Sequence, residues 1–211
     1  MQIAEPTTMI TDYLVAGLSV YFWWRLLIDS GKRQVTAERW WSWAFFATAV
    51  GALAGGTSHG FANHLGETGW LILWKTTIYA LATASLCLLV AALISTFRPG
   101  ALRIVLALAW LKFGLYALFM VRENSFDYVI YDYGSTMAVV LLLQMWGWFR
   151  HRHPASGWII AGILVSFAAS QIQMSGWSLH PHFNHNDMFH VVQMLGLTLL
   201  YRGGLRLDDA S

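Results

Sequence analysis

Residues 180–196, HPHFNHNDMFHVVQMLG, combine four histidines and an aspartate in eleven positions with the start of an apolar run. These side chains are His180, His182, His185, Asp187 and His190. Imidazole and carboxylate groups at this density are typical of metal sites and of proton transfer, although they also occur as solvated side chains on loops. Which interpretation is correct depends on where the helices and loops of the fold place these side chains.

A further histidine, His59, stands in the segment TSHGF at residues 57–61, more than a hundred residues earlier. A catalytic zinc ion is held by three nitrogen, sulfur or carboxylate ligands and keeps one position for water. The only cysteine, Cys87, lies in a separate apolar run, which leaves imidazole and carboxylate as donors. Zinc lowers the pKa of its bound water to about 7, and the resulting hydroxide can attack a carbonyl carbon.

The composition indicates that these groups belong to a membrane protein. Of the 211 residues, 57% are hydrophobic and only 11% are charged, and the mean hydropathy is +0.50, whereas soluble domains hold about 25% charged residues. The net charge of +2 comes without a basic patch, which argues against a nucleic-acid partner. The start MQIAEPTTMITDY lacks the basic region of a signal peptide, so we expect the first apolar segment to be retained.

Seven apolar stretches are long enough to cross a hydrocarbon core of roughly 30 Å as helices. They cover residues 9–29, 41–62, 69–95, 101–121, 126–148, 157–176 and 187–203. The spans lack the alternation of β-barrel strands, and the connections between them are short. The sequence therefore predicts an all-α membrane protein in which residues 1–211 form a single domain of seven transmembrane helices.

The basic residues predict the orientation of this bundle. Ten of the thirteen Lys and Arg residues flank the first, third and fifth connections and the C-terminal tail. The positive-inside rule makes that side cytoplasmic, with the N-terminus outside and the C-terminus in the cytoplasm. His59 then lies near the outer boundary at the end of the second span, and His190 lies there at the start of the seventh.

Charged residues inside the predicted spans are either functional or paired for structural reasons. Lys75 and Asp132 lie one to two turns inside their spans, and we expect them to form an ion pair. Lys112 lies near the middle of the fourth span and needs a partner that the sequence does not identify. His180 and His182 are expected to be solvated loop residues.

The seven-span layout, with TSHGF late in the second span and FHVVQMLG opening the seventh, resembles the superfamily of seven-helix membrane hydrolases. This superfamily contains the alkaline ceramidases and the progestin and adipokine receptor proteins. Its members hold zinc with one histidine of the second span and two of the last, and a serine and an acidic residue complete the site. The resemblance implies a divergent bacterial branch in the inner membrane that uses zinc, bound by His59 and His190, to hydrolyse a lipid-like amide or ester near the outer leaflet.

The third zinc ligand is left open between His185 and Asp187. The family spacing H-x-x-x-H would place it at Asn186. On a continuous helix His185 lies roughly 140° from His190, so it can join the site only if Asn186 caps the helix after it. Asp187 lies three residues before His190 and nearer its face, where it could bind the metal or act as the catalytic base.

The family's serine and acidic residue also have displaced counterparts. The serine position four residues before His59 is Gly55, and Ser58 is the nearest serine. For the acidic residue, Glu67 is the nearest counterpart and Asp132 is the better-buried substitute. Two further functions compete with the hydrolase: a binding or sensor protein that keeps the pocket without turnover, and a structural subunit of a membrane complex. Membrane lipids are the expected partners in each case, and convergence of three ligands would favour the hydrolase.

Overall fold

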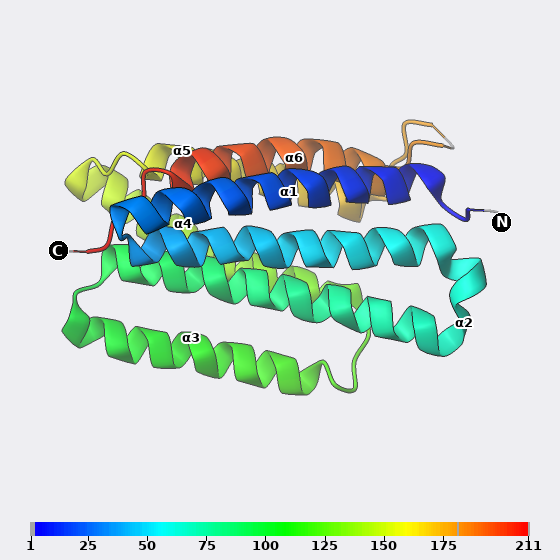
Figure 1. Ribbon diagram of the computed structural model, residues 1–211, viewed down its shortest axis with the longest axis horizontal. Helices are drawn as coiled ribbons and strands as arrows, with labels where there is room; N and C mark the ends of the chain where they lie inside the picture. Colours follow the sequence, from blue (N-terminus) through cyan, green and yellow to red (C-terminus); the bar gives the residue numbers. More distant parts are fainter. Residues whose placement is uncertain (1–2, 181, 211) are drawn as a thin grey trace.

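The computed structural model describes residues 3–180 and 182–210 of the chain, and these residues form a bundle of long helices (Figure 1). The helices are α1 (Pro6–Arg33), α2 (Thr36–Thr96), α3 (Pro99–Phe119), α4 (Phe126–His151), α5 (Ser156–Ser175) and α6 (His185–Gly204). The described residues contain no β-strand beyond one isolated bridge between His180 and Phe183. The predicted all-α fold is therefore confirmed.

Helix α2 consists of two helical segments that meet at Gly66. This residue has φ 63° and ψ 171°, a backbone conformation that glycine adopts and side-chain-bearing residues avoid. The chain turns back there, so that residues 36–65 and 67–96 run side by side (Figure 1). The six helices thus contain seven helical segments, one for each apolar stretch of the sequence.

Four helices, α2, α3, α4 and α5, are long and apolar enough to cross a membrane, which identifies an integral membrane protein. Helices α1 and α6 have 28 and 20 residues and are thus long enough as well. Both carry buried polar side chains, among them Asp12 and Ser19 of α1 and Asp187 and His190 of α6. These two helices hold most of the candidate site.

The connections gather at two opposite ends of the bundle (Figure 1). We call one the basic end: it holds residues 34–35, 97–98 and 152–155 and the tail after α6. We call the other the histidine end: it holds the turn at Gly66 and residues 120–125, 176–180 and 182–184. The predicted segregation of basic residues from the histidine-rich stretch is thus visible in the fold.

Glycines allow the closest helix contacts. A Cβ atom added at Gly56 of α2 would lie 2.7 Å from Cβ of Asp12 in α1. One added at Gly203 of α6 would lie 2.4 Å from Cγ1 of Ile159 in α5 and 3.2 Å from its backbone nitrogen. Such approaches between backbones are how membrane helices gain packing energy without a hydrophobic driving force.

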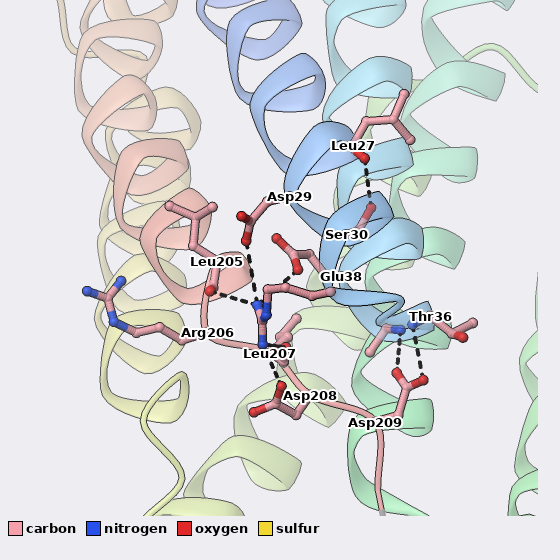
Figure 2. Close-up of polar contacts among 12 residues, drawn as sticks. Leu27, Asp29, Ser30, Thr36, Glu38, Leu205, Arg206, Leu207, Asp208 and Asp209 are labelled. Atoms are coloured by element: carbon pink, nitrogen blue, oxygen red, sulfur yellow. Dashed lines mark hydrogen bonds and ion pairs between the residues drawn. The ribbon is translucent and has the colours of Figure 1, made fainter.

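Arg33 at the end of α1 connects three elements at the basic end. Figure 2 labels its partners Glu38, Leu205, Leu207 and Asp208. Its guanidinium donates to Oε2 of the buried Glu38 at 3.0 Å and to the carbonyl oxygens of Leu205 and Leu207 at 2.9 and 3.0 Å. It also pairs with Asp208 in the tail. We call this arrangement the C-terminal clasp, because it fixes the tail of α6 to the ends of α1 and α2.

The tail also supplies the N-terminal cap of α2. Val35 occupies the cap position and has no side-chain acceptor. The carboxylate of Asp209 instead accepts hydrogen bonds from the backbone N–H groups of Thr36 and Ala37, at 3.0 and 2.7 Å (Figure 2). A carboxylate at this place satisfies exposed donors and matches the helix dipole.

We expect Arg33→Ala to lower the stability of the folded protein by about 1–3 kcal/mol, because it leaves the buried Glu38 carboxylate without its donor. The measurement is thermal unfolding of the protein in detergent. Arg39→Ala is the matched control, because it removes an exposed arginine six residues away that has no part in the clasp. Equal unfolding temperatures for the two variants would contradict the role of the clasp.

Candidate functional site

A cavity of about 620 Å³ occupies the half of the bundle nearer the histidine end. Its wall is formed by α1, by both segments of α2, and by α4, α5 and α6. Most of the lining is apolar, as at Val15, Leu81, Val129, Phe167 and Leu197. The polar lining includes Asp12, His59, Gln171, His190 and Gln193. The cavity thus combines an apolar volume with a few converging polar groups, as small-molecule sites do.

His190 of α6 is held by two consecutive residues of α1. Its Nδ1 lies 2.8 Å from Oγ1 of Thr11, and its Nε2 lies 3.2 Å from Oδ1 of Asp12. All three residues are buried, at 8%, 6% and 7% exposure. Both nitrogens of a buried imidazole therefore have partners, and Nε2 and Asp12 share the cavity wall.

The proton on this imidazole can lie on either nitrogen. If Nδ1 carries it, Nδ1–H donates to Thr11, and Nε2 faces Asp12 as a second acceptor. A proton on the carboxyl group, or a cation, must then lie between Nε2 and Oδ1. If Nε2 carries it, Nε2–H donates to Asp12 and the Thr11 hydroxyl donates to Nδ1. Without a cation, His190 and Asp12 share one proton between Nε2 and Oδ1 in either case.

His59 reaches the same cavity from α2. Its Nδ1 lies 3.2 Å from Oε2 of Glu5, the residue that precedes α1. The backbone N–H of Ala4 donates to the carbonyl of Gly60 at 2.9 Å, which fixes this segment against α2. The two histidines that topology alone placed at one depth, His59 and His190, thus line one cavity.

Sequence reasoning missed Asp12 and Glu5. Asp12 was detectable, because it is a lone carboxylate inside the first apolar stretch, and an ionisable residue within a span is a candidate for function. Glu5 carried no such signal, since it precedes the stretch and could equally have been solvated.

The cap of α6 differs from the expected one. Asn184, not Asn186, caps the helix: its side-chain oxygen accepts from the backbone N–H of Asn186 at 2.8 Å, and Asp187 Oδ2 accepts from the N–H of Asn184 at 2.7 Å. Asn184 and Asp187 can satisfy each other's orphan donors in a capping box, which a cap at Asn186 could not do. His185 consequently lies inside the helix, and it is not part of the cavity lining.

Asp187 is almost fully buried and is committed to this cap and to Thr11, whose hydroxyl lies 3.4 Å from its Oδ1. Ser58 is also buried and donates to the carbonyl of Ala54 within its own helix, at 2.9 Å. Neither residue is part of the cavity lining. Asp187 and Ser58 are therefore buried outside the cavity lining.

Asp132 pairs with Lys112, not with Lys75. The ammonium of Lys112 on α3 donates to Oδ1 of Asp132 on α4 at 2.6 Å and to Oγ1 of Thr136 at 2.8 Å. The Thr136 hydroxyl in turn lies 2.8 Å from that of Ser85 on α2. This network supplies the partner that Lys112 required, and it lies on the α3 side of α4, away from the cavity lining.

The expected pair of Lys75 and Asp132 is wrong because Lys75 has closer acceptors. Its ammonium donates to the carbonyl oxygens of Met120 and Glu123, just after the end of α3. The last carbonyls of a helix lack intrahelical partners and carry the negative end of the dipole, so they attract a cation.

Only two of the three donors that a zinc site needs lie close together among the described residues. The 3.2 Å between Nε2 of His190 and Oδ1 of Asp12 is close to the roughly 3.3 Å that separates two ligands of a tetrahedral zinc ion with bonds of about 2.0–2.1 Å. Among residues 3–180 and 182–210, however, no group of three or more His, Cys, Asp or Glu side chains is arranged to hold a metal. The structure thus places two donors and leaves a third without a position.

The fold and this cavity define the class of protein: an all-helical membrane protein with a buried His–Asp pair on the wall of a cavity between its helices. The chain belongs to the family described as "Family of unknown function (DUF6962)", whose model matches residues 7–209. The match spans the whole site except Glu5. No curated protein and no solved structure matches the chain.

We expect Lys112→Met to destabilise the protein by about 3 kcal/mol, because it leaves the buried carboxylate of Asp132 without a counter-charge. The double variant K112M/D132N should recover part of this loss, since it removes both charges together. Chemical unfolding in detergent micelles measures both effects, and Arg122→Gln is the control for loss of an exposed cation. A single variant as stable as the wild type would show that the pair is not required.

Proposed function

We propose that this chain is a bacterial inner-membrane protein with seven spans, an external N-terminus and a cytoplasmic C-terminus, and that its cavity binds a lipid-like molecule. The seven helical segments and the gathering of basic connections at one end support this arrangement. The histidine end then faces outward. The cavity would lie in the outer half of the membrane, where a lipid is within reach.

The observation that carries the proposal is the buried contact of His190 with Asp12 on the wall of a largely apolar cavity. A volume of about 620 Å³ lies within the roughly 300–1,000 Å³ of small-molecule sites. An amphipathic ligand would bring apolar chains to the lining and a polar group to His190 and Asp12.

The His–Asp pair can serve this ligand through its exchangeable proton. In the tautomer with the proton on Nδ1, a hydroxyl or water of the ligand could replace the Asp12 contact and donate to Nε2, while Thr11 keeps the ring in place. The proton that His190 and Asp12 share could instead be donated to a carbonyl oxygen that replaces one of the two partners. A polar headgroup containing an amide or ester provides both kinds of partner.

A second candidate function is zinc-dependent hydrolysis of that amide or ester. The spacing of Nε2 and Oδ1 favours it, because both atoms could bind one ion. His59 would complete the donor set if its side chain turned from Glu5 toward the cavity; Asp12 is therefore a better third donor than His185 or Asp187, which do not line it. Bound zinc would supply a hydroxide at neutral pH.

We expect Asp12→Asn to weaken lipid binding at least tenfold, because the neutral amide can neither share the proton of His190 nor attract a cation. The measurement is mass spectrometry of lipids and metals that co-purify with the protein, followed by titration of the identified lipid. Glu67→Gln is the matched control, since it neutralises an exposed carboxylate at the same end.

The outcomes separate the two functions. Bound lipid with stoichiometric zinc, both lost in Asp12→Asn, supports the hydrolase. Bound lipid without zinc after zinc supplementation supports binding alone and rejects the hydrolase. If the wild type binds no lipid, or binds it as tightly as the variant does, the cavity has another role.

The proposed orientation has its own test. We expect a membrane-impermeant thiol reagent to label His182→Cys in intact cells and to leave Gly31→Cys unlabelled, because the two exposed positions lie at opposite ends of the bundle. Permeabilised cells provide the control, in which both cysteines should react. External labelling of Gly31→Cys would reverse the orientation.

A further inference from the structure

A second hollow, at the basic end, has chemistry unlike that of the cavity. It is a groove of about 210 Å³ between the last turns of α1 and the end of α6. Its lining consists of Trp24, Arg25, Ile28, Asp29, Lys32 and Leu205. Two cations and three apolar side chains thus surround one small volume.

The two cations of this groove are available to a ligand. Arg25 and Lys32 are exposed, and neither has a hydrogen bond or an ion pair with another described residue. They lie seven residues apart on one side of α1, about 10 Å along the helix axis. The one carboxylate of the groove, Asp29, lies 3.7 Å from the guanidinium of Arg33, and the two cations of the lining outnumber it. The groove therefore favours an anion.

An exposed apolar stripe on α1 leads away from this groove. It consists of Ile10, Leu14, Gly17, Tyr21, Trp24 and Ile28, spaced alternately four and three residues apart, which places them on one face. Trp24 and Ile28 are 54% and 40% exposed and belong to both the stripe and the groove. From Ile28 to Leu14 the stripe extends about 21 Å, more than the roughly 15 Å of hydrocarbon in one leaflet.

We propose that this groove binds the phosphate headgroup of an anionic phospholipid, with an acyl chain lying along the α1 stripe. Arg25 and Lys32 supply the charge that complements the phosphate, and the stripe supplies an apolar surface that begins where the cations end. Basic pockets between membrane helices bind acidic headgroups in this way. The inference rests on the proposed arrangement in which α1 crosses the membrane, and it is independent of the ligand proposed for the cavity.

The test is native mass spectrometry of the detergent-purified protein with phosphatidylglycerol, compared with phosphatidylcholine and with inorganic phosphate. We expect the wild type to retain phosphatidylglycerol preferentially, and R25Q/K32Q to bind it about 30-fold more weakly, which corresponds to about 1 kcal/mol for each cation. The matched control is R103Q/R150Q, which removes two exposed cations outside the groove. It should bind like the wild type.

Three results would overturn the assignment. Equal losses in the two double variants would show a general effect of charge rather than a site. Inorganic phosphate that displaces phosphatidylglycerol at similar concentration would assign the groove to free phosphate. A dimer that dissociates in Leu14→Gln without any change in lipid retention would assign the stripe to a second copy of the chain.

Discussion

The structure depends on one constraint: the imidazole of His190 is buried between helices and must have partners on both nitrogens. Thr11 and Asp12 meet that requirement from a helix 178–179 residues away in the chain. Their approach is possible because Gly56 has no side chain where Asp12 lies. Helix packing and the candidate site are therefore not separable, since the same glycine that lets α1 approach α2 also positions the carboxylate of the cavity.

The same constraint explains why α1 and α6 are neighbours. Each carries buried polar groups that would be costly in an apolar bundle. Thr8 and Thr11 of α1 lie beside Asn184 and Asp187 at the start of α6, so the polar groups of one helix satisfy those of the other. At the opposite end Arg33 connects α1 with the tail of α6. The pair of helices is thus fixed by polar contacts at both ends.

The sequence predicted the helices well because apolar length decides them, and it placed His59 and His190 together because topology decides depth. The sequence could not determine which residues at the same membrane depth would pair with one another. Whether Asp132 meets Lys75 or Lys112 depends on the rotation and tilt of α3 and α4, which only side-chain packing determines. The cap of α6 was misplaced by two residues for a local reason: Asn186 is a good cap alone, but Asn184 gains a reciprocal bond from Asp187. Asp12 stands alone in the first apolar stretch, and no spacing in the sequence relates it to His190.

The two sides of the cavity have different roles as a result. The α1 and α6 side holds Asp12 and His190 in fixed positions, so it determines which polar group a ligand can present. The α4 side contributes mainly apolar residues and Gly134, where an added Cβ atom would meet nothing within 4 Å. Apart from Gly134, the α4 residues of the lining are mostly large, such as Phe126, Ile130, Tyr133 and Met137, and these side chains set the space on that side. Chemical selectivity then depends on residues whose partners are buried polar groups, whereas the length and bulk of the apolar part depend on α4.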